Sequence, residues 1–226
     1  MPVIRYNRHS LGDKRHFSNL GLCRFRIFDR DFNSLEQVYQ FLKIITFGYK
    51  EAAEKILSSP TPLDCLHAAK LVLSDGVLEK WKDIRLTVMK ALLYLKFVEN
   101  WDAQAALLQT GDAELVEATS QPFWGGCSGG INAHGKLLSE VRNMIRAGQR
   151  FPSNVIIGDS ILQRIHSADF LCLFLRGGTR IPIFRLAHLF LSLPGVQTIC
   201  IHVGTNDICP RNQPRGSPAR SIGMLF

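Results

Sequence analysis

The chain has 226 residues, a formal net charge of +8 at pH 7 and 46% hydrophobic residues. This length suits one large domain or two small ones, and the apolar content suffices for a core of ordinary size, so the chain need not be disordered. No run of eighteen apolar residues occurs, which argues against a membrane-spanning helix, and the first residues lack the apolar stretch of a secretory signal. We therefore expect an intracellular protein, cytoplasmic or nuclear, with no membrane partner.

The cysteines argue against a metal site, whereas the charges leave two explanations open. The six cysteines show no CxxC spacing and no zinc-ligand pattern, so we expect reduced thiols, no metal and no cofactor. The first thirty residues carry seven basic and two acidic side chains, hence a net charge of +5. Such a stretch can attract nucleic acid or another polyphosphate, and the alternative is an ordinary solvated surface.

Residues 1–147 have mainly helical patterns. A helix is predicted over 34–48, with Ser34 as its N-cap and Gly48 as its end. Two short strand-like runs precede it, over 22–28 and around 32. Further helices are predicted over 48–59, 76–100, 101–110 and 137–148.

Residues 148–226 have a different sequence pattern, in which strand-like runs alternate with a helix. The change falls at "RAGQRFPSN", Arg146 to Asn154, and we place the domain boundary there. Two β-rich apolar runs, "NVIIGDS" and "VQTICIHVGTND", are separated by a predicted helix that starts near Ser160. Strands that alternate with helices predict a parallel sheet, whose sites lie at the carboxyl ends of the strands.

Three residues of this second region suggest hydrolase chemistry. Ser160 follows a predicted strand, and with Gly178 and Asn206 it could supply donors to an oxyanion hole. The motifs "IIGDSILQRI" and "IHVGTND" resemble the first and third sequence blocks of the SGNH hydrolases, which implies a partial α/β three-layer segment. In that family the block-one serine is the nucleophile, and the second-block glycine and third-block asparagine complete the oxyanion hole.

The resemblance to SGNH hydrolases is incomplete. The family's Asp-x-x-His base lies well downstream of the serine, but only nineteen residues follow Asp207, and none is histidine. A serine without a base is a poor nucleophile. We therefore predict a vestigial SGNH site in a truncated segment, without esterase activity.

In the first region, Glu36, Gln40 and Lys43 share one face of the helix predicted over 34–48, opposite its apolar face. The plain interpretation is the solvated side of an amphipathic helix. A second feature, "FWGGCSGGIN", gathers glycines around Trp124 and Asn132 just before a predicted helix. Glycines allow backbone N–H groups to approach phosphate, although a flexible turn is the usual explanation of such a loop.

The order of these pieces resembles the NADAR family, also called YbiA-like, over about residues 5–146. The matching pieces are "FSNL", "SLEQVYQFLK", the Trp81, Arg85 and Met89 set, "LKF", "LLQTGDAELVEAT", "FWGG", "GIN", "GKLL" and "VR". The resemblance implies a mainly helical α+β fold and an N-glycosidase that cleaves a base–ribose bond. Its substrates would be phosphoribosylamino-pyrimidines or ADP-ribose attached to guanine, so the partners would be such a small molecule or ADP-ribosylated nucleic acid.

On that resemblance Glu36 and Lys43 would be catalytic, Glu36 moving protons and Lys43 attacking the ribose C1 carbon. Five further residues would hold base and phosphate: Trp81, Arg85, Trp124, Gly125 and Asn132. Glu117 could support the site or simply end a helix.

One departure from the family pattern keeps another function open. The family often has an acid three positions before the loop tryptophan, where this chain has Gln121. If that acid assists the chemistry, the protein would instead be a non-catalytic binder of ADP-ribose or nucleotides.

Overall fold

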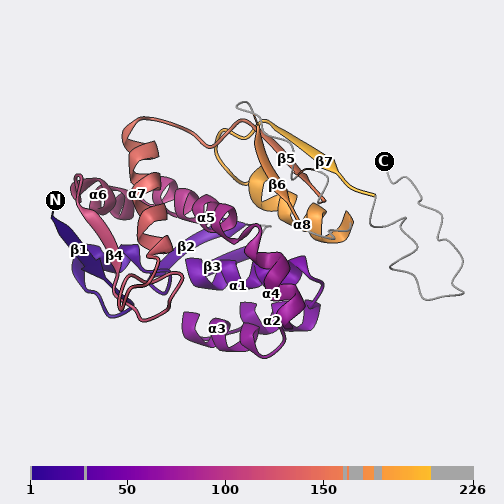
Figure 1. The fold of residues 1–226 in the computed structure, drawn as a ribbon, viewed down its shortest axis with the longest axis horizontal. Helices are drawn as coiled ribbons and strands as arrows, with labels where there is room; N and C mark the ends of the chain where they lie inside the picture. Colours follow the sequence, from indigo (N-terminus) through magenta and orange to yellow (C-terminus); the bar gives the residue numbers. More distant parts are fainter. Residues whose placement is uncertain (1, 28–29, 160–161, 163–169, 176–179, 205–226) are drawn as a thin grey trace, which may run out of the picture.

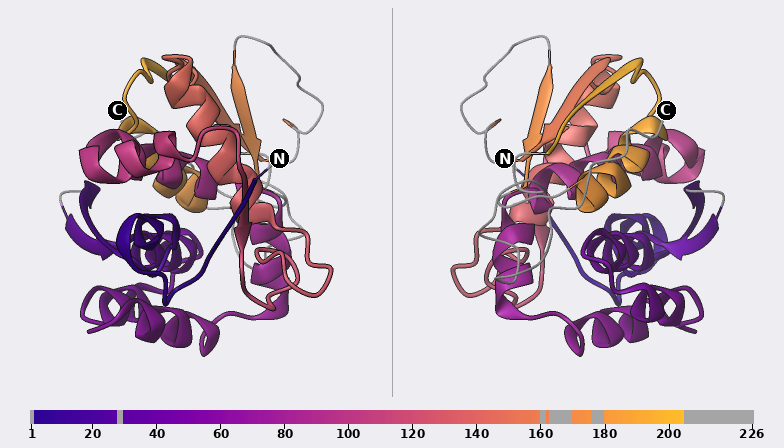
Figure 2. Two further views of the ribbon diagram at one scale, coloured as in Figure 1. Left: turned by 90° about the vertical axis from the view of Figure 1, so that its left-hand side faces the viewer. Right: turned by 90° about the vertical axis from the view of Figure 1, so that its right-hand side faces the viewer.

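The computed structural model describes residues 2–27, 30–159, 162, 170–175 and 180–204 (Figure 1). A mainly helical region comes first, and a smaller layer of strands with one helix lies against one side of it (Figures 1 and 2). In these residues no helix combines the length and the apolar content needed to cross a membrane.

The first region is an α+β structure, as predicted. Its elements are β1 (Val3–Tyr6), the 3-10 helix η1 (Gly12–Phe17), β2 (Leu22–Ile27), β3 (Arg30–Ser34), α1 (Leu35–Thr46), α2 (Lys50–Leu57), α3 (Pro62–Lys70), α4 (Asp75–Lys82), α5 (Arg85–Glu99), α6 (Trp101–Gln109), β4 (Glu114–Glu117) and α7 (Ala133–Arg146). Strands β1 and β4 pair in parallel, and β2 and β3 form an antiparallel pair. The pairing of β1 with β4 joins the start of the chain to the strand that precedes the glycine-rich loop.

Local signals set the ends of α1 as the sequence predicts. The Ser34 side chain accepts a hydrogen bond from the Gln37 N–H at 3.1 Å, which is the expected N-cap contact. Gly48 has φ of +93°, and its N–H donates to the Ile45 carbonyl at 3.1 Å. A residue with a side chain rarely adopts that φ, so glycine ends the helix there.

The prediction of one helix over 76–100 is wrong. The chain forms α4 and α5 instead, with a break at Asp83 and Ile84, whose N–H groups donate to carbonyls three residues back. No glycine or proline marks this break in the sequence. The turn accompanies a tertiary contact, since the Trp81 Nε1–H donates to the Tyr39 hydroxyl at 2.8 Å.

The short elements β1, β4 and α3 are not among the predictions. Each has few residues, so its periodicity is weak, although Thr61 caps α3 and Pro62 occupies its first turn. Helix α7 begins at Ala133, four residues before the predicted start.

The second region contains β5 (Asn154–Gly158), β6 (Leu171–Phe174), α8 (Arg180–Leu191) and β7 (Thr198–His202). The strands form a parallel sheet in the order β6-β5-β7, which confirms the predicted parallel arrangement. The helix predicted to start near Ser160 falls mostly on residues outside the described ranges.

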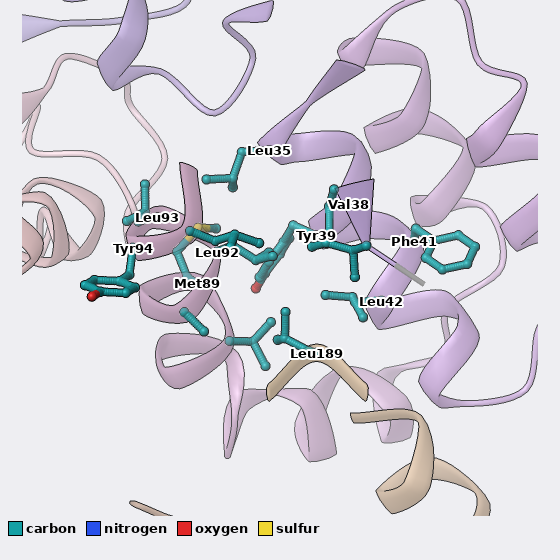
Figure 3. Close-up of a cluster of buried hydrophobic side chains, with 14 of the residues drawn as sticks. Leu35, Val38, Tyr39, Phe41, Leu42, Met89, Leu92, Leu93, Tyr94 and Leu189 are labelled. Carbon is teal, nitrogen blue, oxygen red and sulfur yellow. The ribbon is translucent and has the colours of Figure 1, made fainter. Parts of the chain in front are cut away.

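Helix α8 connects the two regions. It packs against α1 on one side and against β5 and β7 on the other. Leu189 of α8 lies in the same buried cluster as Leu42 of α1 and Leu92 of α5 (Figure 3). The Arg185 side chain donates to the Ile45 carbonyl at the end of α1, where a cation is favoured by the helix dipole. The boundary at 147 stays a prediction, and the apolar core is continuous across it.

Candidate functional site

The polar face of α1 is buried, so its interpretation as a solvated face is wrong. Only 9% of Glu36 and 2% of Gln40 is exposed, and Lys43 is half-buried. The Gln40 Nε2–H donates to Glu36 Oε1 at 2.6 Å, which fixes the carboxylate along the helix. A buried acid and a half-buried amine on one helix face are unusual for a structural surface and typical of a reactive site.

Desolvation brings the proton affinities of this acid and amine toward each other. Burial raises the pKa of Glu36, and the Gln40 hydrogen bond and the Lys43 charge oppose that rise. Burial lowers the pKa of Lys43 from 10.5 to about 8, while the nearby Glu36 charge works against the shift. Lys43 therefore has a sizeable neutral fraction near physiological pH, as an amine nucleophile requires.

Tyr39 is the aromatic centre of the site. Its ring lies 5.5 Å from the Trp81 ring, 6.1 Å from the Trp124 ring and 5.5 Å from Lys43 Nζ. Tyr39 is not among the site residues predicted from the sequence, because its spacing on α1 does not distinguish it from a core residue. The ring brings the predicted Trp81, Trp124 and Lys43 to one place.

Arg85 is linked to the same site because it stacks on Phe123, which neighbours Trp124. Its guanidinium lies 3.3 Å from the centre of the Phe123 ring, and that ring lies 4.8 Å from the Trp124 ring. Burial lowers the pKa of Arg85, and its Nε has no hydrogen-bond partner among the described residues. A cation stacked on an aromatic ring with an unused donor can bind a phosphate or the edge of a base.

The glycine-rich loop is packed rather than open. The Gly125 N–H donates to the Gln121 carbonyl and the Gly126 N–H to the Glu117 carbonyl, at 2.9 and 2.8 Å. A Cβ on Gly125 would lie 2.3 Å from the Thr119 carbonyl oxygen. The expectation that the loop offers these N–H groups to phosphate is therefore wrong at both glycines, which instead allow close packing against Thr119 and Val116.

Asn132 holds the loop to strand β4. Its Nδ2–H donates to the Leu115 carbonyl at 2.9 Å, and its Oδ1 accepts from the Glu117 N–H at 3.1 Å. Asn132 is buried and has φ of +56°, a conformation that asparagine tolerates better than most residues. These contacts support a role in positioning the loop rather than in holding the substrate directly.

We expect Gly125→Ala to destabilise the protein by about 1–3 kcal/mol, because the backbone at Thr119 must move away. Gly76→Ala in α4 is the matched control. A Cβ there meets nothing within 4 Å, so we expect an unchanged or slightly higher stability. Urea unfolding of the two variants measures the difference, and equal stabilities would contradict the close packing of the loop.

Gln121 caps the loop with its side chain. Its Oε1 accepts hydrogen bonds from the Phe123 and Trp124 N–H groups, each at 2.9 Å. A carboxylate at this position could accept the same two hydrogen bonds. Glutamine in place of the family's acid therefore removes a negative charge but keeps a hydrogen-bond acceptor for the two N–H groups.

We therefore expect Gln121→Glu to keep the stability of the wild type, whereas Gln121→Ala loses about 1 kcal/mol, as other capping residues do. Chemical denaturation monitored by tryptophan fluorescence compares the three proteins. A Gln121→Ala variant as stable as the wild type would show that the two hydrogen bonds do not hold the loop.

Glu117 also belongs to the site. It ends β4, and its Oε2 is buried with no hydrogen-bond partner in the described part of the chain. Burial and the charge of Glu36 raise the pKa of Glu117 to about 7. The Gly126 N–H, two residues after Trp124, donates to the Glu117 carbonyl at 2.8 Å, so Glu117 is tied to the loop that carries Trp124.

Two hollows lie away from these residues. One, of about 360 Å³, lies where β2 and β3 face the turn before α3, and the other, of about 530 Å³, lies between α5, α7 and residues 149–152. Neither is lined by Glu36 or Lys43. The aromatic rings around Tyr39 occupy the centre of the candidate site, so we assign the site by its chemistry and not by an open cavity.

The predicted SGNH residues Ser160, Gly178 and Asn206 lie outside the described residues, and their convergence stays a prediction. Asp159, which precedes Ser160, is buried at the end of β5 and lies 3.8 Å from His202 of β7. Among the described residues no three His, Cys, Asp or Glu side chains are grouped as a metal site.

Comparisons with known proteins match mainly the first region of the chain. The family model described as "NADAR domain" matches residues 6–146. The "N-glycosidase YbiA" of Escherichia coli (strain K12) is 29% identical over 136 residues, which cover 59% of this chain and 82% of the relative. The "Riboflavin biosynthesis protein VVA0006" of Vibrio vulnificus is 30% identical over 151 residues, or 64% of this chain and 39% of that protein. The NMR structure of the E. coli protein YbiA, at 26% identity and a TM-score of 0.54, covers 66% of this chain and 88% of that one.

Proposed function

Because this chain belongs to the NADAR domain family, we propose that it is an N-glycosidase, a hydrolase that cleaves the bond between a base and ribose. The relatives named N-glycosidase YbiA support the reaction class. We further propose ADP-ribosylated guanine or a phosphoribosylamino-pyrimidine as the substrate. The relative named a riboflavin biosynthesis protein favours the pyrimidine, although it is matched over only 39% of its length.

Lys43 is the proposed nucleophile. In the opened ribose, C1 forms an imine with the base nitrogen. The neutral amine of Lys43 adds to C1 and passes one of its two protons to the base nitrogen, which takes up a second proton as the C1–N bond breaks. Loss of the remaining amine proton to Glu36 gives an imine between C1 and Lys43 Nζ. Water then adds to C1 and displaces Lys43, whose nitrogen regains one proton from Glu36 and one from the water adduct as the sugar is released.

Aromatic and cationic side chains supply the proposed binding contacts. Trp124 lies next to Tyr39 and Phe123, and a base can stack on such a surface. Arg85 has an unused Nε–H near the same rings and could meet a phosphate or a carbonyl of the base.

The observation that carries the proposal is the burial of Glu36 with Lys43 on one face of α1. The test is incubation with ADP-ribosylated guanosine or a phosphoribosylamino-pyrimidine, followed by chromatography of the released base. We expect release by the wild type, loss with Glu36→Gln, and no change with Glu51→Gln, an exposed acid in the first turn of α2.

The second candidate is a binder of ADP-ribose or nucleotides without turnover. Gln121, neutral where the family often has an acid, favours this function. Tight binding of the same compounds with no release of base over prolonged incubation would replace the glycosidase proposal with this one.

A further inference from the structure

The backbone around Glu117 is fixed by the loop and by strand β1. Its N–H donates to Asn132 Oδ1, and its carbonyl accepts from the Gly126 N–H. In the parallel pairing of β1 and β4, Glu117 is the register partner of Tyr6, so both residues stand at the carboxyl ends of their strands. That end of a parallel pair is where polar side chains can meet a ligand.

The side chain of Glu117 has a buried oxygen that the protein does not satisfy. Native proteins leave few buried polar atoms without a partner. In the described residues four such atoms belong to α1, to β4 and the residue two positions after it, and to Arg85: Gln40 Oε1, Glu117 Oε2, Thr119 Oγ1 and Arg85 Nε. Gln40 is only 2% exposed and already donates to Glu36, so its free oxygen is deep in the site. A ligand with donor and acceptor groups, such as a base, would satisfy them.

We propose that Glu117 is a second catalytic carboxyl, the acid that protonates the departing base. This inference rests on the proposed N-glycosidase function. It assigns separate tasks to the two acids: Glu36 takes the proton from Lys43, and Glu117 gives one to the base.

The proton that leaves with the base is returned to Glu117 later in the same turnover. As the C1–N bond breaks, its electron pair goes to the base nitrogen, which receives the Glu117 proton and leaves as the neutral base. Glu117 is then a carboxylate. The water that later adds to C1 gives its hydroxyl to the sugar and one proton back to Glu117, so that each turnover consumes one water and restores both acids.

The surroundings of Glu117 raise its pKa to about 7, so a large fraction of this carboxyl is protonated near neutral pH. Glu36 on α1 is the acid that acts on it, and Tyr6 on β1 is the register partner beside it. His134 on α7 bonds to the Tyr6 hydroxyl at 2.6 Å and to Asn19 Oδ1 at 2.6 Å, and burial lowers the pKa of His134 to about 3. His134 is therefore neutral and adds no positive charge.

The first test measures the carboxyl pair directly. Carbon-13 NMR of the glutamate carboxyl groups should show Glu117 titrating near pH 7 in the wild type. In Glu36→Gln the pKa of Glu117 should fall, because the neighbouring negative charge is gone. Glu114→Gln, at the exposed start of the same strand, should leave the pKa of Glu117 unchanged. Titration of Glu117 at its ordinary value would overturn the proposal, and this result does not depend on finding a substrate.

The second test is kinetic. Lys43 must be neutral and Glu117 must be protonated, so base release should rise as Lys43 loses its proton and fall as Glu117 loses its own. The two pKa values, about 8 and about 7, give a bell-shaped profile with its maximum between them. Glu117→Gln should lower the single-turnover rate about 10²–10⁴-fold and leave only the ascending limb. Full activity of Glu117→Gln would overturn the role of Glu117, whereas absence of base release from the wild type would overturn the glycosidase itself.

Discussion

Lys43→Met is expected to lower base release by a factor on the order of 10³ or more, because the variant removes the proposed nucleophile. Lys43→Arg should be equally inactive, since a guanidinium keeps its proton and cannot attack carbon. Single-turnover assays with saturating protein separate this loss from a weaker affinity for the substrate.

The matched control for Lys43 is Lys55→Met, which removes an exposed lysine on the neighbouring helix α2 and should be without effect. If Lys43→Arg released base at the wild-type rate, Lys43 would act as a fixed charge, and the covalent mechanism would be wrong.

Phe190→Ala is expected to destabilise the helical region, although Phe190 lies more than forty residues beyond the family match. Phe190 of α8 is 0% exposed and belongs to the core shared with α1, so its truncation should cost about 3–5 kcal/mol. Phe184→Ala on the same helix removes a ring that is 50% exposed and should change stability by about 0.5 kcal/mol or less.

The three tryptophans, Trp81, Trp101 and Trp124, report on this prediction because all of them lie in the first region. If α8 and α1 share one cooperative core, tryptophan fluorescence should show the Phe190→Ala loss in full. An unchanged tryptophan transition would mean that residues 148–226 unfold independently of the helical region.

The sequence predicts the elements whose signals are local. Ser34 and Gly48 bound α1 because an N-cap hydroxyl and a left-handed glycine act on adjacent backbone groups. The order of the NADAR motifs correctly indicates the family, since it reflects many residues at once. The strands β1 and β4 and the break between α4 and α5 depend on distant contacts, and no local residue marks them.

The burial of the candidate site could not be predicted from periodicity. The polar row of α1 fits a solvated face only if the helix lies at the surface, but α1 packs against α2, α3, α5, α8 and β3. Likewise, the glycines at 125 and 126 suggest an open loop until the hydrogen bonds to Gln121 and Glu117 are seen. Both misinterpretations arise where tertiary packing decides what a local pattern means.

The most direct test of the account is chemical trapping on Lys43. The wild type is mixed with substrate in the presence of borohydride, digested, and mapped by mass spectrometry. We expect a ribosyl adduct on the peptide that contains Lys43, formed with release of the base and absent from Glu36→Gln. Release of base with no adduct on Lys43, or with the adduct on another lysine, would contradict the proposed nucleophile.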